Sequence, residues 1–160
     1  MNTTQHVCTQ AGEVVRSLAV SPSEEHRSRR TKVLVVDDYV EAAESMAEGL
    51  REFGYQVEVA LDGASALAIA SHFTPDVCLL DLGLPLMDGY EVARRLRDNP
   101  QMPDDLRIIA VTGYAHEGAR RRTTAAGFDA HLVKPVDLDA LAMAVKNATA
   151  RAANRRFGDA

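Results

Sequence analysis

The feature that most constrains the fold is a regular alternation of short β-branched runs with longer segments of helical periodicity. Residues 32–37 form the first run, and its residues 33–36 are continuously apolar, as a strand covered on both faces should be. The segment 40–53 then carries apolar residues at helical spacing, and Gly54 ends it. The alternation predicts strands over 32–37, 55–60, 76–81, 106–112 and 129–134, and helices over 40–53, 63–73, 89–99, 116–127 and from 137 onward.

Five strand–helix units imply a parallel sheet with helices on both faces, joined by right-handed crossovers. Five strands in roughly 120 residues suit the flavodoxin-like doubly wound α/β fold, with strand order 2-1-3-4-5. We therefore expect a single domain over residues 32–150. The polar, mixed-charge residues 1–31 are expected to be a flexible N-terminal extension, and residues 151–160 a basic C-terminal tail.

Composition excludes several classes of function. The formal net charge of −5 argues against nucleic-acid binding, which favours a basic surface. No apolar run approaches the ~20 residues that cross a bilayer, and the N-terminus lacks the pattern of a secretory signal. The two cysteines, Cys8 and Cys78, make no disulfide framework, and Cys78 is expected to be a small buried hydrophobic residue. We expect a cytoplasmic protein that binds neither nucleic acid nor membrane.

Polar residues follow the apolar runs at the carboxyl ends of the expected strands. Asp37 and Asp38 end the first strand, Asp81 the third, Thr112 the fourth and Lys134 the fifth. In the expected strand order the first and third strands are neighbours, and open α/β sheets bind ligands at this switch point, beyond the carboxyl ends. The topology therefore predicts that these five side chains gather at one edge of the sheet.

Three carboxylates held close together repel one another, so a cation must compensate them. Oxygen donors favour a hard ion, Mg²⁺ or else Mn²⁺, over Zn²⁺. Lys134 and Thr112 suit phosphoryl oxygens, and an Asp can act as a nucleophile that forms an acyl phosphate. Each residue also has a structural alternative: Asp38 could cap the next helix, Lys134 could be a solvated surface lysine, and Thr112 an ordinary strand-end residue.

Four stretches carry a resemblance to a known family: "VLVVDDY", "LLDLGLPLMDGYEVARRLR", "AVTGYA" and "AGFDAHLVKPV". Over about residues 32–150 the sequence resembles the receiver domain of bacterial two-component response regulators. The likeness is greatest to single-domain receivers and to those attached to hybrid histidine kinases. It implies a signalling phosphoacceptor, not an enzyme with a separate substrate. The donor would be a phosphohistidine on a histidine kinase or a histidine phosphotransfer protein.

The resemblance also implies a role for each residue of the site. Asp81 would be the phosphoacceptor, and Lys134 would pair with the phosphoryl group. Asp37 and Asp38, with Asp81 and the backbone carbonyl of Gly83, would hold Mg²⁺. The resemblance thus gives every strand-end acid a function.

A second set of residues would carry the response. Thr112 would be the switch hydroxyl, and the Lys134–Pro135 peptide bond would be cis. His131 stands where the family usually has an aromatic switch residue, and it could instead be a surface residue. The expected output surface is the face of the fourth helix, fifth strand and final helix, which would bind a downstream protein or a second copy. The arginines at 120–122 could dock an acidic partner there or form a solvated face.

Other functions fit less well. Phosphatases of the haloacid-dehalogenase kind need a second acid two residues after the nucleophile, where this chain has Gly83. Nucleotide-binding enzymes need a glycine-rich phosphate loop, which the sequence lacks. A phosphate-shuttling module of a hybrid kinase or phosphorelay remains an alternative, as does a protein-binding scaffold, although a scaffold would tolerate loss of the acids. About ten residues follow the expected last helix, too few for a DNA-binding effector domain.

Overall fold

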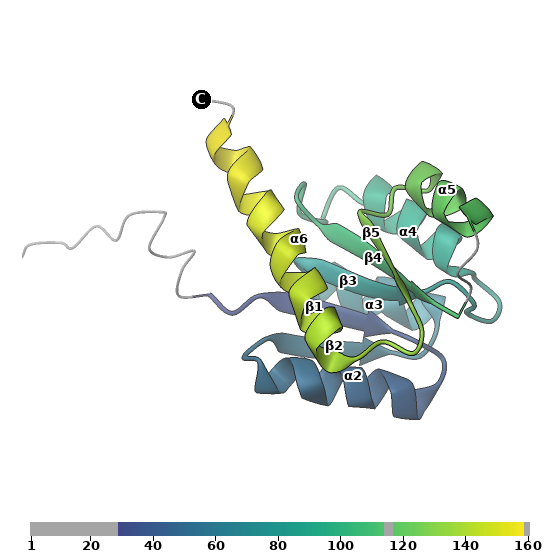
Figure 1. Cartoon of the computed structure of the whole chain (residues 1–160). Helices are drawn as coiled ribbons and strands as arrows, with labels where there is room; N and C mark the ends of the chain where they lie inside the picture. The colour runs from purple at the N-terminus through teal and green to yellow at the C-terminus, as the bar shows by residue number, and fades with distance from the viewer. Residues whose placement is uncertain (1–28, 114–116, 159–160) are drawn as a thin grey trace, which may run out of the picture.

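The computed structural model describes residues 29–113 and 117–158, in which strands and helices alternate as the sequence predicts (Figure 1). The last helix continues to Gly158, so it includes most of the segment expected as a tail. Most of the expected N-terminal extension lies outside the described residues. The elements are β1 (Lys32–Val36), α2 (Val40–Glu52), β2 (Gln56–Ala60), α3 (Gly63–Phe73), β3 (Val77–Asp81), α4 (Gly89–Asp98), β4 (Arg107–Thr112), α5 (Glu117–Ala125), β5 (Ala130–Val133) and α6 (Leu138–Gly158).

The strands form one parallel sheet in the order β2-β1-β3-β4-β5, which confirms the predicted doubly wound topology. The register aligns the carboxyl ends of the central strands. Val36 of β1 lies opposite Leu80 of β3, and Asp81 lies opposite Val111 of β4. Asp37 follows Val36 directly, so the acids that end β1 and β3 lie side by side at the switch point.

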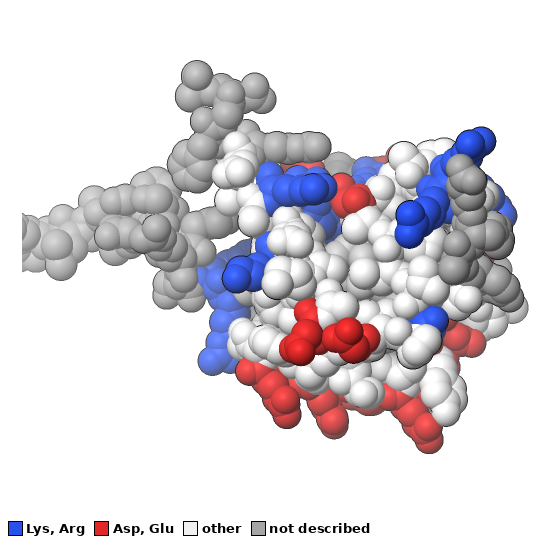
Figure 2. All heavy atoms as spheres, viewed as in Figure 1, with Lys and Arg blue, Asp and Glu red and all other residues white. Residues whose placement is uncertain are grey.

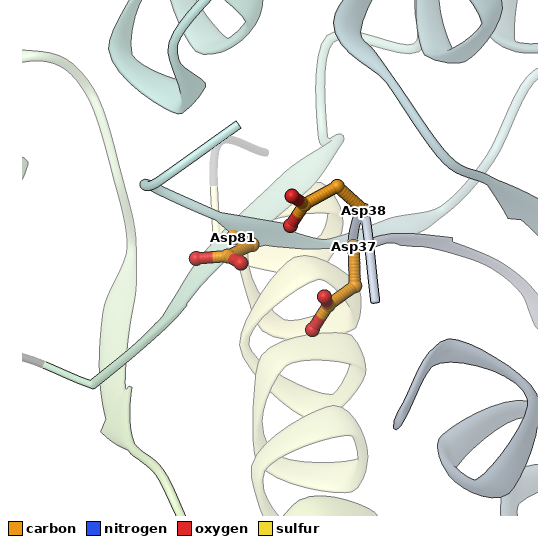
Figure 3. A group of neighbouring side chains, drawn as sticks. All are labelled: Asp37, Asp38 and Asp81. Atoms are coloured by element: carbon orange, nitrogen blue, oxygen red, sulfur yellow. The ribbon is translucent and has the colours of Figure 1, made fainter. Parts of the chain in front are cut away.

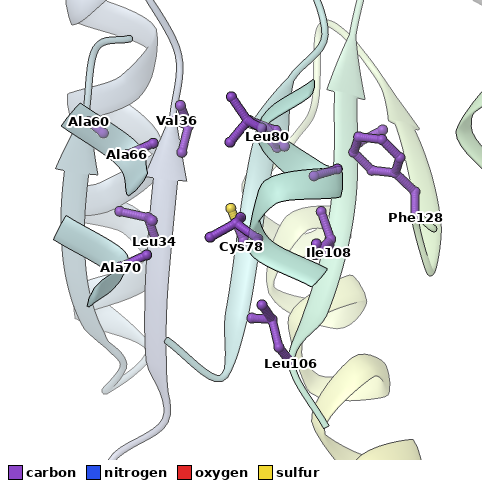
Figure 4. Packing of buried hydrophobic residues seen from close by; sticks show 14 of the residues in the cluster. Leu34, Val36, Ala60, Ala66, Ala70, Cys78, Leu80, Leu106, Ile108 and Phe128 are labelled. Atoms are coloured by element: carbon purple, nitrogen blue, oxygen red, sulfur yellow. The ribbon is translucent and has the colours of Figure 1, made fainter. Parts of the chain in front are cut away.

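Helices cover both faces of the sheet, with α2 and α6 on one face and α3, α4 and α5 on the other (Figure 1). Because side chains alternate along a strand, each strand contributes to two separate cores. The core under α3 and α4 includes Leu34, Val36, Cys78, Leu80, Ile108 and Phe128, with Ala66 and Ala70 of α3 (Figure 4). The core under α2 and α6 includes Val33, Val35, Leu79, Ile109 and Val111, with Leu50 of α2 and Val145 of α6.

Cys78 is fully buried in the first of these cores, as the sequence predicts. Burial raises the pKa of its thiol to about 12, so the side chain is a neutral hydrophobic residue at physiological pH. Cys8 lies outside the described residues. Among the residues that the structure describes, no helix has both the length and the apolar surface that crossing a bilayer requires.

The helix ends follow the sequence signals in part. The side chain of Asp88 accepts a hydrogen bond of 2.9 Å from the backbone N–H of Glu91 and so caps α4, as its spacing predicts. Gly54, with φ of +91°, follows the end of α2. The alternative in which Asp38 caps α2 is wrong, because Tyr39 is the N-cap residue and forms no side-chain cap. Asp38 is therefore left free for another role.

The C-terminal half of helix α5 is joined to α4 by side-chain contacts. Arg97 of α4 donates two hydrogen bonds, of 2.9 and 3.2 Å, to the carbonyl oxygen of Gly127, just beyond α5. The same guanidinium lies 2.7 Å from a carboxylate oxygen of Asp129. The guanidinium of Arg122, on α5, lies 4.6 Å from the ring centroid of Tyr90 on α4. These contacts tie the C-terminal half of α5 to α4.

Candidate functional site

Three carboxylates meet at the carboxyl edge of the sheet. Asp37 and Asp38 come from the end of β1 and Asp81 from the end of β3, and each can place one oxygen within 4.8 Å of the others (Figure 3). Their burial differs: Asp37 is fully buried, Asp81 is 9% exposed and Asp38 is exposed. The cluster therefore has a buried floor at Asp37 and an open side at Asp38.

Lys134 lies against the two inner carboxylates. Its Nζ atom is 2.6 Å from Oδ2 of Asp37 and 3.2 Å from Oδ2 of Asp81. Its backbone N–H donates to the carbonyl oxygen of Thr112, and the Lys134–Pro135 peptide bond is cis. Burial lowers the pKa of Lys134, but the hydrogen bond to Asp37 and the charges of Asp81 and Asp37 outweigh it, so the pKa lies above its usual value of 10.5. Lys134 is therefore a charged partner of the acids and not a freely solvated lysine.

Backbone N–H groups hold both inner carboxylates in place. Oδ1 of Asp37 accepts from the N–H of Tyr39 at 2.9 Å, and Oδ1 of Asp81 accepts from the N–H of Gly83 at 3.0 Å. The family resemblance implies a metal-binding role for the carbonyl of Gly83, and the structure adds a contact of its amide with Asp81. Each carboxylate thus has one oxygen fixed by the backbone and the other facing Lys134.

Gly89, at the start of α4, is a residue that the sequence analysis missed. A Cβ atom there would collide with the carbonyl oxygen of Asp81 and would lie 2.8 Å from Cα of Leu82. Its backbone N–H donates to the carbonyl oxygen of Leu82 at 3.2 Å. The available signal was a glycine directly after the capping residue Asp88. The lack of a side chain at Gly89 therefore lets α4 begin in close contact with the end of β3, which carries Asp81.

Thr112 is at the end of β4 and is 1% exposed. It directly follows Val111, the register partner of Asp81, and it lies opposite Val133, which precedes Lys134. The structure therefore brings Thr112 to the same edge of the sheet as the acids and the lysine. That edge contains all five of the strand-end residues that the sequence singled out.

His131 lies on the same face of the sheet as Thr112, opposite Ala110 in the register. Its ring is half-buried, with Nδ1 3.5 Å from the hydroxyl of Thr123 on α5. Its Nε2 atom is buried and has no hydrogen-bond partner among the residues that the structure describes. His131 is therefore packed beneath α5 and is not a simple surface residue.

The donor set fits a hard divalent cation. All three acids offer carboxylate oxygens, which Mg²⁺ and Mn²⁺ prefer. Lys134 offsets one of their negative charges, so the arrangement favours a further cation. The exposed position of Asp38 leaves one side of such a site open to water and to a phosphoryl oxygen.

Solved structures of other proteins share this fold. The chain resembles a CheY-like receiver domain from Methanospirillum hungatei JF-1, with a TM-score of 0.73 and 28% identity over 79% of this chain and 99% of that one. It also resembles the chemotaxis protein CheY4 of Vibrio cholerae, with a TM-score of 0.71 and 30% identity over 75% and 99% of the two chains.

Curated relatives have the same region within longer proteins. The sensor histidine kinase RcsC of Salmonella typhi is 38% identical over 68% of this chain and 11% of its own length. The transcriptional regulatory protein PrrA of Mycobacterium leprae is 37% identical over 72% of this chain and 48% of its own. The chain thus spans less than half the length of these two relatives. The family model of the response regulator receiver domain matches residues 33–146, so the chain belongs to the response regulator receiver domain family.

Proposed function

We propose that Asp81 accepts a phosphoryl group from a phosphohistidine of a histidine kinase or a histidine phosphotransfer protein, in the cytoplasm. The observation that carries this proposal is that Asp81 lies beside Lys134 and forms a cluster with two further acids. Asp37, Asp38, Asp81 and the carbonyl of Gly83 would hold Mg²⁺, or Mn²⁺ in its place. Such an ion, when bound, would offset the negative charge of the phosphoryl oxygens.

The proposed transfer requires little from the protein beyond positioning and charge. A carboxylate oxygen of Asp81 attacks the phosphorus, an O–P bond forms, and the P–N bond of the phosphohistidine breaks. The donor imidazole keeps the electron pair of that bond and takes up a proton. Lys134 already lies 3.2 Å from Asp81, where its ammonium can pair with a phosphoryl oxygen. Later hydrolysis of the acyl phosphate by water would reset the protein, so the chain acts as a signalling phosphoacceptor.

Phosphorylation would be read at the face of α5, β5 and α6. The Thr112 hydroxyl would donate to a phosphoryl oxygen and draw in the loop after β4, which leads into α5. The ring of His131 would then repack beneath α5. Helix α5 buries few large side chains and carries arginines at 120–122, which suits a loosely docked helix with a basic outer face. The reader would be a downstream protein or a second copy of the chain.

Treatment with acetyl phosphate tests the transfer. The intact mass should increase by one phosphoryl group in the presence of Mg²⁺, and the increase should be absent with chelator or in Asp81→Asn. Asp104→Asn, at an exposed loop position, is the matched control and should gain the same mass as the wild type. An equal gain in Asp81→Asn, or none in the wild type, would reject Asp81 as the acceptor.

Hydrogen exchange tests whether the face of α5, β5 and α6 responds to phosphorylation. Addition of beryllofluoride with Mg²⁺ should change the protection of α5 and of β5 beneath it, because the mimic occupies the phosphoryl position. Unchanged protection there would reject this face as the output surface.

A phosphorelay shuttle is the second candidate function, and similarity to a receiver region of a sensor histidine kinase favours it. A shuttle should pass its phosphoryl group back to a histidine phosphotransfer protein faster than it loses the group to water. A scaffold function would require that neither donor phosphorylates Asp81.

A further inference from the structure

A buried side chain outside the acidic site is only partly paired. Arg107 is the first residue of β4, and its side chain is 7% exposed. Its Nη1 atom lies 2.9 Å from Oδ1 of Asp129. Its Nε and Nη2 atoms are also buried, and neither has a hydrogen-bond partner among the residues that the structure describes. An unpaired buried N–H group costs free energy, so these two donors require an acceptor.

The two unpaired donors have the geometry of a bidentate site. A guanidinium group is planar, and the N–H of Nε runs parallel to one N–H of Nη2. Such a pair matches two oxygens of one carboxylate or phosphate, and charge strengthens both hydrogen bonds. Asp129 contacts Nη1, which leaves this pair for another acceptor. The shape of the pair therefore favours an oxyanion over a single carbonyl or hydroxyl oxygen.

The charges around Arg107 also favour an anion. Asp129 is shared, because its Oδ2 atom lies 2.7 Å from Nη2 of Arg97 while Oδ1 pairs with Arg107. Two cations thus face one anion, and one positive charge is left over. Asp76 lies at the same edge of the sheet, where its backbone oxygen accepts from the N–H of Arg107, but its carboxylate is bound by Arg29. A water molecule would pair with the donors and leave the buried charge uncompensated.

Helix α6 lies over the face of the sheet that carries Arg107. Side chains alternate along a strand, and Ile109 and Val111 lie in the core under α2 and α6, so Arg107 faces the same side. Helix α6 packs against β3 and β4, and Figure 1 shows it passing the start of β4. Its last residue in that core is Ala148, and most of residues 149–154 are exposed. The end of α6 therefore buries little and can move away from the sheet at low cost in free energy.

The surface around this end of α6 is basic. Lys146 and Arg151 are exposed, and Figure 2 shows Lys and Arg side chains beside the second half of α6 as Figure 1 places it. Positive charge at a surface raises the local concentration of anions. Anions are thus attracted to the part of the molecule in which Arg107 is buried, although the whole chain has a net charge of −5.

We propose that Arg107 binds a small oxyanion, whose two oxygens accept hydrogen bonds from Nε and Nη2 when the end of α6 moves aside. Free phosphate and the carboxylate of a small organic acid share this chemistry. The site lies at the amino edge of the sheet, about 17 Å along β4 from Thr112. A bound anion offsets the unpaired charge and links the starts of β4 and β5 through Asp129. The proposal does not depend on phosphorylation of Asp81, and its failure would leave the proposed function intact.

Titration of the full chain with inorganic phosphate or with acetate tests the site. A chelator is present, so that no divalent ion draws phosphate to the acidic site, and chloride keeps the ionic strength constant. The readout is the NMR signal of the Arg107 Nε–H group, together with the backbone amides of Ile108 and Asp129. These signals should shift in a saturable way with at least one of the two anions. A shift confined to the amides of Gly83 and Lys134 would place the anion at the acidic site and overturn the proposal.

Two variants and a control identify the donors. Arg107→Met removes both donors while filling a similar volume, and replacing a buried, half-paired cation by an apolar group is often tolerated. The affinity, read from the amides of Ile108 and Asp129, should fall about tenfold or more. Arg107→Lys keeps the charge without the parallel donors and should also bind more weakly than the wild type. Arg94→Met, at an exposed position of α4, changes the net charge by the same amount as Arg107→Met and should bind like the wild type.

No saturable shift with either anion would overturn the proposal and would mean that the two donors are satisfied without an anion. Equal affinity in Arg107→Met and Arg94→Met would overturn it as well, because the anion would then bind elsewhere. If Arg107→Met does not fold, Arg107→Lys decides, since affinity equal to that of the wild type would reject the bidentate site. A preference for phosphate or for acetate supports the site in either case and identifies the class of its ligand.

Discussion

At the scale of single residues, the site depends on one ammonium group placed between two carboxylates. Replacing it by Lys134→Met should leave Asp37 buried without its charged partner. We expect the free energy of unfolding without Mg²⁺ to fall by about 1–3 kcal/mol, because the lysine side chain is itself partly exposed. Addition of Mg²⁺ should restore most of the loss. Urea unfolding with and without chelator measures both effects, and an unchanged midpoint without Mg²⁺ would contradict the account.

The pairing of Lys134 with the acids also predicts that the stability of the protein depends on pH. The folded-state pKa of Lys134 lies above its usual value of 10.5, chiefly through Asp37 and Asp81, which outweigh the opposing effect of burial. Its contribution to stability is therefore complete below about pH 10.5 and is lost as the pH rises through the higher folded-state value. The difference in unfolding free energy between the wild type and Lys134→Met should shrink across that window. A difference that stays constant up to full denaturation would count against the pairing.

Gly89 gives a steric prediction. Gly89→Ala should lower the free energy of unfolding by about 1–3 kcal/mol, because its Cβ would press on the backbone of Asp81 and Leu82. The matched control is Gly113→Ala, where a Cβ would meet nothing within 4 Å, and its stability should stay near that of the wild type. Equal stability of the two variants in urea would show that α4 does not need this close approach.

The predictable residues were those at strand ends. Asp37, Asp81 and Lys134 follow apolar runs, so strand order alone placed them together. The amide of Gly83 and the close approach of Gly89 depend on the paths of loops, which periodicity does not determine. Burial of His131 beneath α5 likewise depends on packing between elements. Sequence therefore predicted which residues meet, and the structure was needed for how they are held.

At the scale of elements, contacts with Arg97 of α4 hold the chain just beyond the end of α5. Arg97→Met would remove the hydrogen bonds to Gly127 and the ion pair with Asp129, so we expect a loss of about 1–2 kcal/mol. Hydrogen exchange should also increase at the C-terminal end of α5. Arg95→Met is the control, because Arg95 pairs with Glu91 on its own exposed helix face, and the substitution should cost within about 0.5 kcal/mol. Equal exchange in the two variants would mean that Arg97 does not anchor α5.

The spacing of apolar residues was enough to predict the type of each element, because short β-branched runs indicate buried strands and amphipathic segments indicate helices. Helix starts were less predictable. Asp38 and Asp88 both have cap spacing, yet only Asp88 caps a helix, because the turn after β1 places Tyr39 at the N-cap position. The segment expected as a tail from residue 151 is helical as far as Gly158, which fits the lack of glycine and proline over residues 147–157.

At the scale of the whole molecule, topology turns distant sequence positions into one site. Asp37 and Lys134 are 97 residues apart, yet strand order brings their side chains into a hydrogen bond. Charged side chains are likewise separated by the sheet. Exposed glutamates lie on α2, on one face, and exposed arginines lie on α4 and α5, on the other. The fold thus places the proposed phosphoacceptor, Asp81, at one edge of the sheet and side chains of opposite charge on its two faces.

The most direct test of the central claim is to identify the residue that receives phosphorus. After phosphorylation with Mg²⁺, borohydride reduces an aspartyl phosphate to homoserine, which peptide mass spectrometry locates in the sequence. The account predicts homoserine at position 81 alone, with Asp37 and Asp38 unmodified, and none when Mg²⁺ is chelated. Homoserine at either of those two positions, or an unmodified Asp81 after the same treatment, would contradict it.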